Sequence, residues 1–392
     1  MDPGPEPQAT RGQALSPRVT VAAITALVLL GVATRLAQFV FGRSLWLDEL
    51  LLALNIESRG FGGLLEPLDY GQFAPVGFLW TTKAAVLALG PGEQAYRLVA
   101  FAAGVGALLL FVPLVRRLAS PAGCVLGVGL FACLPRLVFY SSELKQYSVG
   151  LFAVTLVLLL TVWLWESDRA WWRWLLLAVA GVVLQFFSLT VIFALGASAM
   201  VVTLDQLWRR QWRGAAAGTV IGLAWAGQFV GLYLLFYRYG SESGLLNTYW
   251  AGAFMPRPIA SMDTAKWLIE SWYQIIPTED GRGGGEGLQV HRYSGVLGLL
   301  MLAGLFEVYR RSPRLLALLL VPLALLLLAA GVQAYPIFSR LVLFAAVIVL
   351  ALAAAGGGLI FDLVAKQRPR IAVLLLAAVL VFPVGYALMR IP

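Results

Sequence analysis

The chain has 392 residues, of which 60% are hydrophobic and 12% charged, and its mean hydropathy is +0.83. This composition is typical of a protein that crosses a membrane several times, and it excludes an ordinary soluble domain. The net charge of +9 comes mostly from arginines in short turns between apolar segments, which indicates topology rather than nucleic-acid binding. Cys124 and Cys133 lie in one apolar segment and indicate no disulfide framework.

The first 18 residues are rich in Pro and Gly and have no apolar core, so we predict that residues 1–18 form a disordered cytoplasmic tail. Residues 19–40 form an apolar segment of spanning length, too long for a signal peptide and without a small-residue cleavage site. Ten further segments can span about 30 Å of hydrocarbon. They lie at residues 98–115, 121–139, 148–165, 172–189, 190–208, 214–236, 295–309, 315–334, 341–363 and 371–389.

The predicted fold is therefore all-α, a polytopic membrane protein with about 11 transmembrane helices and interfacial helices in its outer loops. We divide it into a transmembrane module at residues 19–236, a large outer loop at 237–294 and C-terminal transmembrane helices at 295–392. The first module contains a first outer loop at residues 41–96. We see no internal repeat of the kind that marks many secondary transporters.

The segment from Pro75 to Gly90 determines the topology. It carries Lys83 in its middle and would span only about 24 Å as a helix. If it lies in the interface, all the arginine-rich short turns fall on one side, which the positive-inside rule assigns to the cytoplasm. We therefore predict eleven crossings, with the N-terminus in the cytoplasm, the C-terminus outside and this segment on the outer leaflet.

The large outer loop contains a pattern typical of an amphipathic helix. Its apolar face consists of Ala265, Leu268, Trp272, Ile275 and Ile276, and its polar face of Asp263, Lys266, Glu270 and Gln274. This separation predicts an interfacial helix. The glycine-rich residues 280–287 that follow are either a mobile flap or a plain linker.

Charged residues converge on the predicted outer side, in a chain that is otherwise poor in charge. They are Asp48 and Glu49 after the first span, Arg97 before the second, Glu143 and Lys145 before the fourth, and Arg340 before the tenth. Carboxylates and cations at the lipid boundary suit a substrate with an anionic headgroup and an apolar tail. The cations would hold a phosphate and a carboxylate would accept a proton from a hydroxyl. Taken singly, each cation is more often a snorkelling interface residue.

Four motifs follow one another in the order and spacing of bacterial GT-C glycosyltransferases. They are Trp46 to Glu49, Asp69 to Pro75, Glu93 to Leu98, and Tyr140 to Tyr147, and the segment from Tyr335 to Phe344 is similar to a late motif. The chain thus resembles the protein O-mannosyltransferase and lipid A aminoarabinose transferase group. The resemblance is strong over most of residues 35–165 and rests elsewhere on architecture and the late motif.

The resemblance implies an inverting transferase that moves a sugar from a polyprenyl-phosphate-linked donor to a hydroxyl of a glycan, lipid or protein acceptor. It implies a multi-pass protein of the bacterial inner membrane, with an active site that faces the periplasm or the cell exterior. Asp48 matches the general base, Glu49 a supporting carboxylate and Glu143 the second acid, and the choice between Asp48 and Glu49 as base stays open. We expect Lys145, Arg340 and Arg97 at the donor phosphate, and Asp69, Gln72, Tyr147 and Tyr335 at the substrate.

Two departures and one alternative accompany this interpretation. Phe73 and Ala74 replace the Glu-Lys pair of aminoarabinose transferases, which argues against that sugar. His291 is the only histidine, so a multi-histidine metal site is excluded, and no cofactor is indicated except a divalent cation held by carboxylates. The alternative is a transporter or flippase of a lipid-linked saccharide, whose carboxylates should lie near the bilayer midplane instead of its boundary.

Overall fold

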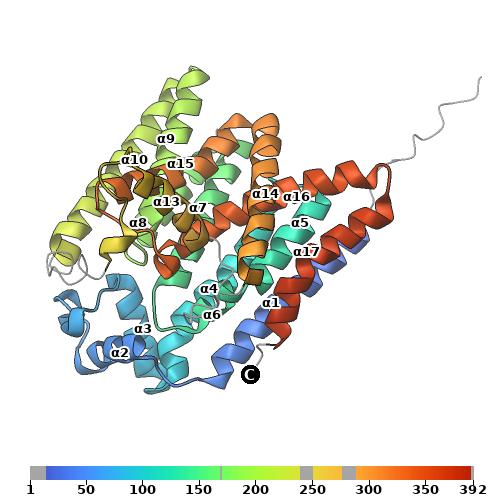
Figure 1. Cartoon of the computed structure of the whole chain (residues 1–392). Helices are drawn as coiled ribbons and strands as arrows, with labels where there is room; N and C mark the ends of the chain where they lie inside the picture. The colour runs from blue at the N-terminus through green and yellow to red at the C-terminus, as the bar shows by residue number, and fades with distance from the viewer. Residues whose placement is uncertain (1–14, 168–169, 239–249, 276–287, 390–392) are drawn as a thin grey trace, which may run out of the picture.

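The computed structural model describes residues 15–167, 170–238, 250–275 and 288–389, with side chains undescribed at 288–292. Within these ranges all regular secondary structure is helical (Figure 1). Most of the predicted tail and the glycine-rich residues 280–287 lie outside the described residues. The described end of the tail differs from the prediction, because the first helix already begins at Pro17, after Ser16, whose hydroxyl accepts from the Val19 N–H.

The helices follow one another along the whole described chain. They are α1 (Pro17–Phe41), α2 (Leu47–Ser58), α3 (Val76–Leu89), α4 (Glu93–Val115), α5 (Pro121–Cys133), α6 (Pro135–Phe139), α7 (Tyr147–Glu166), α8 (Trp171–Gln185), α9 (Val191–Trp208), α10 (Trp212–Leu232), α13 (Met262–Ile275), α14 (Leu288–Arg311), α15 (Pro313–Gly331), α16 (Ala346–Ala365) and α17 (Pro369–Met389). Short 3-10 turns include η3 (Tyr140–Ser142) and η6 (Ser339–Ala345).

Each of the eleven predicted spans contains a helix. Among the described residues, eight helices are long and apolar enough to cross a membrane, and α5 with α6 and η3 makes a ninth if a bent pair counts as one span. The other two predicted spans correspond to α8, which has 15 residues, and to α14, which carries charged side chains in its last turns. The chain is a multi-pass helical membrane protein.

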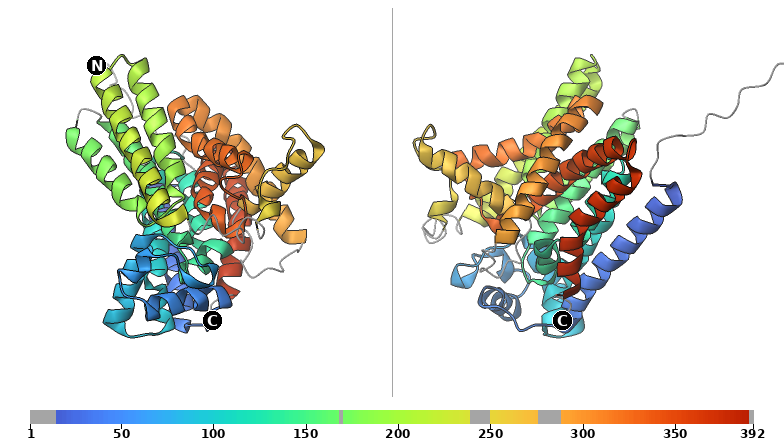
Figure 2. Two further views of the ribbon diagram at one scale, coloured as in Figure 1. Left: turned by 90° about the vertical axis from the view of Figure 1, so that its left-hand side faces the viewer. Right: turned by 45° about the vertical axis from the view of Figure 1, so that its right-hand side comes forward.

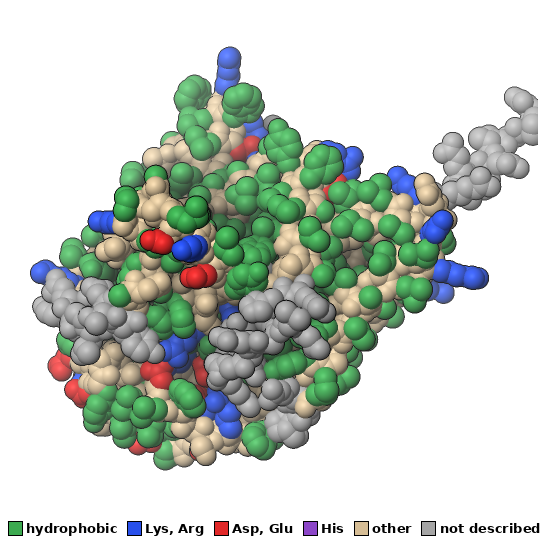
Figure 3. Space-filling model, viewed as in Figure 1, with side chains coloured by type: hydrophobic (Ala, Val, Ile, Leu, Met, Phe, Trp, Pro, Cys, Tyr) green, Lys and Arg blue, Asp and Glu red, His purple; other side chains and the backbone are tan. Residues whose placement is uncertain are grey.

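The two terminal helices run in the same direction along the bundle. Both α1 and α17 pack against α5, and the beginning of α1 and the end of α17 lie at opposite ends (Figures 1 and 2). A chain whose two termini lie at opposite ends of the bundle passes through it an odd number of times, and the predicted number of eleven crossings is odd. Basic side chains protrude at the end where α1 begins, and a largely hydrophobic surface separates them from a mixed acidic and basic area (Figure 3).

The two ends of the bundle carry different residues. The arginine-rich end carries residues 116–117, 166–167, 170–173, 209–213, 310–314 and 366–370. The loop end carries the end of α1, together with α2, α3 and the turn between η3 and α7 (Figure 1).

The first loop is more helical than the sequence predicts. Besides the expected helix α3, it contains α2, whose first turn carries Asp48 and Glu49. Lys83 is buried in α3 and donates from Nζ to the backbone carbonyls of Ile56 (2.8 Å) and Glu57 (3.2 Å), near the end of α2. A cation is favourable there because the last carbonyls of a helix lack partners within that helix. Lys83, which the sequence analysis places at the membrane interface, therefore holds α3 to the end of α2.

The core of the bundle is built around α16, which packs against α14 and α5. Gly304 of α14 and Gly356 of α16 let the two backbones approach closely. A Cβ at Gly304 would lie 1.9 Å from the carbonyl oxygen of Leu352, and one at Gly356 would lie 1.9 Å from that of Leu300. Small residues let the helices pack closely, and this packing holds helices together in lipid, where the hydrophobic effect does not.

The predicted span at residues 121–139 is interrupted. The axes of α5 and the α6–η3 segment differ by 54°, and Pro135 begins α6. Because Pro135 has no N–H, the carbonyl of Phe131 cannot make its usual helical bond. The fully buried Arg35 of α1 supplies the missing donors, to Phe131 (3.1 Å) and Ala132 (2.8 Å). A buried cation thus stabilises the broken helix.

The predicted amphipathic helix is α13, and the face that contacts the protein is only partly the expected apolar face, because Trp272 and Ile275 pack against the core. Thr264, Trp267 and Ser271 are buried, whereas Leu268 is 44% exposed. Gln274, expected on the solvated face, accepts two hydrogen bonds from the rest of the protein. Apolar packing of Trp267, Trp272 and Ile275 and these polar contacts together fix this helix to the bundle.

Candidate active site

The first turn of α2 presents two adjacent carboxylates to different surroundings. Trp46 is the N-cap, and the Glu49 carboxylate accepts the Trp46 N–H (3.0 Å), as in a capping box. Acidic side chains are favourable in a first turn because the helix N-terminus carries partial positive charge. This local preference explains why the chain begins a helix at Leu47 and leaves Asp48 at its solvent-accessible start.

Asp48 lies between two cations that come from distant parts of the chain. Its Oδ1 is 3.0 Å from Lys145 Nζ, and its Oδ2 is 3.1 Å from Arg340 Nη1. Gln72 completes the arrangement, because it donates to Asp48 Oδ1 (3.3 Å) and accepts from Lys145 Nζ (2.8 Å). The Asp48 side chain remains 28% exposed. The first loop, the η3–α7 turn and η6 therefore meet at one carboxylate.

These contacts keep Asp48 ionised. Burial alone would raise the pKa of Asp48, but Lys145 and Arg340, with hydrogen bonds from Lys145 and Gln72, outweigh burial and lower that pKa below its usual value. Burial lowers the pKa of Lys145, which Asp48 only partly opposes. Asp48 is a proton acceptor at neutral pH, and its basicity depends on how firmly the two cations hold it.

Glu49 is enclosed where Asp48 is open. Its side chain is 1% exposed and is held by Arg97 through two parallel bonds, from Nε and Nη2, each 2.8 Å long. The N–H of Leu144 donates to the same carboxylate (2.7 Å). Burial would raise the pKa of Glu49, but Arg97 and these backbone donors lower it. The pair joins α2, α4 and the turn before α7 at one point.

Glu143 is a buried acid with one cation beside it. Arg43 Nη2 lies 3.4 Å from its Oε1 and also donates to the carbonyl of Ser142. Burial, with the nearby charge of Glu49, raises the pKa of Glu143 to about 7, although Arg43 and Arg340 oppose this shift. Glu143 therefore titrates near neutral pH, unlike Asp48 and Glu49.

The structure places the other expected site residues at different distances from Asp48. A cavity of about 100 Å³ beside Arg340 is lined by Tyr147 and Tyr335, with the Arg340 guanidinium 5.8 Å from the Tyr147 ring centre. Tyr335 donates its hydroxyl to the carbonyl of Leu341 (2.8 Å). Asp69 does not join this group, because its side chain is 62% exposed and pairs with Arg59 (2.8 Å).

Two residues of the site were missed by the sequence analysis. Arg43 pairs with Glu143 and lies 3.8 Å from Glu49, and its position five residues before Asp48 could have indicated it. Gln274 of α13 accepts from the Ser339 N–H (2.9 Å) through its side chain and from Arg136 Nη1 (2.6 Å) through its backbone. Only the folded structure reveals that contact, because it joins residues 65 and 138 positions apart.

The cluster has an excess of positive charge. Three acids (Asp48, Glu49 and Glu143) face four cations (Arg43, Arg97, Lys145 and Arg340), a net charge of +1 when all are ionised. Each of these acids already has a cationic partner, so the donor set does not fit a divalent cation. In the described ranges no group of three His, Cys, Asp or Glu side chains is arranged to hold a metal. The arrangement suits an anion of modest size.

Two larger cavities adjoin the cluster at the loop end. One, of about 370 Å³, lies between α13 and residues 250–253 and 337–338, and its lining includes Trp250, Trp267, Glu270, Gln274 and Phe338. The Trp250 ring centre is 5.8 Å from the Arg340 guanidinium, which places this cavity next to the cluster.

The other cavity measures about 270 Å³ and is lined by the first loop and by residues 236–237, which follow α10. Its walls are mostly apolar and include Gln72, Phe73 and Tyr237. Gln72 also bonds to Asp48, so this space adjoins the cluster from the opposite direction.

The chain is a multi-pass helical membrane protein with a charged cluster at one end, and its superposition on solved structures gives it the GT-C fold. ArnT from Cupriavidus metallidurans bound to undecaprenyl phosphate superposes with a TM-score of 0.57 and 14% identity, over 95% of this chain and 75% of that one. The oligosaccharyltransferase AglB from Archaeoglobus fulgidus, in complex with an inhibitory peptide and a dolichol-phosphate, has a TM-score of 0.57 and 13% identity, over 95% and 56%.

The similarity is one of fold. The chain spans only about half of AglB, at 56% of its length. No family model and no curated protein sequence matches the chain. Neither of these two solved structures supports the transporter alternative.

Proposed function

We propose that this chain is an integral membrane glycosyltransferase that moves a sugar from a polyprenyl-phosphate-linked donor to a hydroxyl of a cell-envelope acceptor. The acceptor is a glycan, a lipid or a protein, and the transfer inverts the anomeric carbon. We place the protein in the bacterial inner membrane with the loop end facing the periplasm or cell exterior. The sidedness rests on the arginine-rich turns at the opposite end.

The observation that carries this proposal is Asp48 held between Lys145 and Arg340. A carboxylate beside two cations, at one end of a GT-C bundle, combines a proton acceptor with an anion site. Both functions are needed in one place when a hydroxyl attacks a carbon whose leaving group is a phosphate.

In the proposed step one bond forms at the anomeric carbon and one breaks. The acceptor oxygen forms a bond to the anomeric carbon while its proton passes to Asp48. The bond from that carbon to the phosphate oxygen breaks, and polyprenyl phosphate leaves with the electron pair. Arg340 and Lys145 neutralise the charge that develops on the phosphate. Because these cations now lower the pKa of Asp48, their engagement by phosphate would make Asp48 a stronger base.

The remaining residues have supporting roles in this proposal. Arg97, expected at the phosphate, is fully engaged by Glu49 and the backbone, so we assign both to positioning α2. Gln72 orients Asp48 and Lys145. Tyr147 and Tyr335 line the small cavity beside Arg340 and are kept as substrate-binding candidates.

We also propose roles for Glu143 and Asp69 and a division of the chain into three regions. Glu143, paired with Arg43, is kept as the second acid. Asp69 would act only at the loop surface, where it is exposed. Residues 19–236, 237–294 and 295–392 remain the proposed transmembrane module, outer loop and C-terminal helices.

The test uses cells that lack the protein and cells that produce a variant. Loss of the transferase should leave a polyprenyl-phosphate monosaccharide in the lipid extract, detectable by mass spectrometry. Wild-type protein should clear it, and Asp48→Asn, which keeps the shape and removes the base, should be slower by about 10²–10⁴-fold. Asp263→Asn, the same change at an exposed site on α13, is the matched control and should clear it normally.

Purified protein separates transfer from transport. In detergent, with the accumulated lipid as donor and cell envelope as acceptor, a transferase still releases polyprenyl phosphate, whereas a transporter has no compartments to act between. Clearance by Asp48→Asn at the wild-type rate would remove Asp48 as base. The absence of donor cleavage by purified wild-type protein would contradict the transferase itself.

A further inference from the structure

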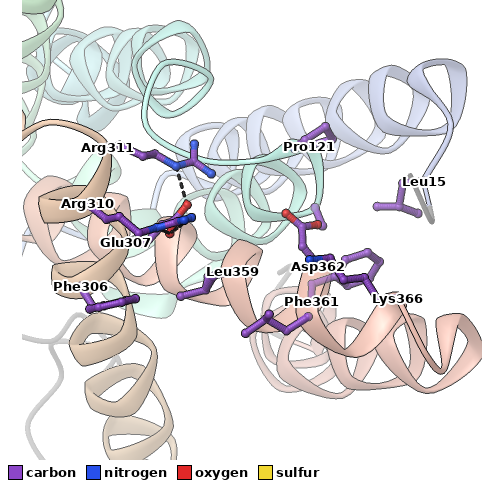
Figure 4. A pocket seen from close by; sticks show the side chains of 12 residues that line it. Leu15, Pro121, Phe306, Glu307, Arg310, Arg311, Leu359, Phe361, Asp362 and Lys366 are labelled. Carbon is purple, nitrogen blue, oxygen red and sulfur yellow. Dashed lines mark hydrogen bonds and ion pairs between the residues drawn. The ribbon is translucent and has the colours of Figure 1, made fainter. Parts of the chain in front are cut away.

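A further cavity lies at the arginine-rich end, away from the Asp48 cluster. It encloses about 560 Å³ between the last turns of α14 and α16 and the first turn of α5 (Figure 4). Phe306, Arg310 and Arg311 line it from α14, and Asp362 and Lys366 line it from α16. The proposed transfer reaction uses none of these residues.

The charge in this cavity is built around a buried acid. Glu307 has a side chain only 2% exposed, and both Arg310 (3.0 Å) and Arg311 bond to its carboxylate. One carboxylate neutralises only one of the two guanidinium groups. The bonds use Nε and Nη2 of Arg310 and Nε of Arg311, and within the described residues neither guanidinium has another partner. N–H donors and one positive charge therefore remain for a ligand.

Lys366 adds a second source of positive charge. It is exposed at the other wall of the cavity and has no hydrogen-bonded partner among the described residues, while Asp362 provides one negative charge. Counting Arg310, Arg311 and Lys366 against Glu307 and Asp362 gives a net charge of +1 (3 − 2). A singly charged phosphodiester matches this excess, and guanidinium groups bind phosphate oxygens through paired hydrogen bonds.

An apolar surface continues from the cavity toward the loop end. On α14, Leu299 (67% exposed), Leu302 (59%) and Phe306 (61%) lie at helical spacing on one face, and Phe306 lines the cavity. Leu363 of α16 also lines it and is exposed. Hydrocarbon chains attached to a phosphate in the cavity could follow this face. A soluble phosphate would leave it uncovered.

We infer that this cavity binds the headgroup of an anionic phospholipid in the leaflet at the arginine-rich end. The phosphodiester lies against Arg310, Arg311 and Lys366, and the acyl chains lie along the apolar face of α14. Basic cavities between membrane helices recognise lipid headgroups in this way. The site is independent of the proposed transfer reaction.

Native mass spectrometry of the full-length protein in detergent tests this inference. With equal amounts of a phosphatidylglycerol and a phosphatidylcholine, wild-type protein should retain mainly the anionic lipid. Arg310→Gln with Lys366→Gln should reduce that retention by about tenfold, since charged hydrogen bonds are lost. Glu307 keeps Arg311 in this variant, and Lys366→Gln alone, at an exposed position, gives a second variant that should fold. Arg213→Gln, an exposed arginine at the same end, should bind like wild type.

Three outcomes would overturn the inference. Both cavity variants retaining phosphatidylglycerol like wild type would remove these cations from the site. Equal retention of phosphatidylcholine would show annular lipid only. Displacement of the lipid by millimolar inorganic phosphate would show a site for a free anion.

Discussion

Asp48 and Glu49 are neighbours in sequence but have opposite environments, because successive residues of a helix point about 100° apart. Asp48 faces an accessible space with two cations, whereas Glu49 faces the interior and is closed in by Arg97. Exposure favours Asp48 as the base, since an acceptor hydroxyl must reach it. Glu49 instead fixes the start of α2.

Glu143 should make stability depend on pH. Its pKa is about 7 in the folded protein and about 4.5 when exposed, so between these values only the folded state holds the proton. Stability is therefore expected to fall as pH rises from about 4.5 to 7, and to level off above 7. Glu143→Gln has no proton to lose, and its thermal midpoint should change by roughly 2 °C less across this range. Thermal unfolding of purified protein from pH 5 to pH 8 measures the difference.

The same scan on Glu66→Gln, an exposed acid of the first loop, should reproduce the wild-type slope. A Glu143→Gln slope equal to wild type would show that Glu143 is already ionised at pH 5. Glu49, Arg43 and Arg340 are the charges that act on Glu143, so Arg43→Gln should move the transition to higher pH.

Part of the site could be predicted from residue types alone. Asp48, Lys145 and Arg340 were expected to converge, and they do, because each follows or precedes a predicted span at the same end. Arg97 was expected at the phosphate, but its contacts depend on where α2 begins. That detail comes from a capping interaction at Trp46, which no composition pattern reports.

At the scale of helices, the contact between α14 and α16 should be sensitive to a single methyl group. Gly304→Ala would place a Cβ 1.9 Å from the Leu352 carbonyl oxygen, so the helices must separate. We expect a loss of roughly 1–3 kcal/mol of stability, as for other overpacked sites. A lower thermal midpoint in detergent measures it.

The matched control lies on the same helix. A Cβ at Gly295 would meet nothing within 4 Å, so Gly295→Ala should change stability by about 0.5 kcal/mol or less. Equal midpoints for the two variants would mean that α14 does not pack on α16 as described.

The shorter helices illustrate what a hydropathy pattern can and cannot predict. Helix α3 was expected from a short apolar run and α13 from its amphipathic periodicity, and both are present. The break between α5 and α6 was not expected, because its 54° bend falls inside a run of spanning length that is apolar except for Arg136. Pro135 was the available signal, but proline also occurs inside α4, at Pro113, where the helix continues without a break. The buried arginine that satisfies the break is remote in sequence.

For the whole molecule, the predicted orientation can be tested by labelling. Glu66 and Gln367 are exposed at the loop end and the arginine-rich end, and both native cysteines are buried. In spheroplasts, Glu66→Cys should react with an impermeant maleimide, and Gln367→Cys should react only after permeabilisation. Wild-type protein provides the background. The reverse pattern would move the proposed site to the cytoplasm.

The order of the long helices followed from the spacing of apolar segments, because each span must be long enough to cross hydrocarbon. The packing of the helices against one another did not follow, since an apolar side chain in a membrane can contact either lipid or a neighbouring helix. Gly304 and Gly356 illustrate this: the sequence contains many glycines, and only the structure shows which two backbones meet.

Arg35 imposes an order on biosynthesis. Its partners, the carbonyls of Phe131 and Ala132, are 96 and 97 residues further along the chain, so they do not exist when α1 leaves the ribosome. Until then Arg35 has the Gly31 carbonyl, one turn earlier in α1, as its partner (2.9 Å), and an arginine within a membrane span is unfavourable. The buried arginine of α1, the first helix to be translated, therefore gains its full set of hydrogen bonds only after α5 is inserted. This couples the insertion of the first helix to that of a later one.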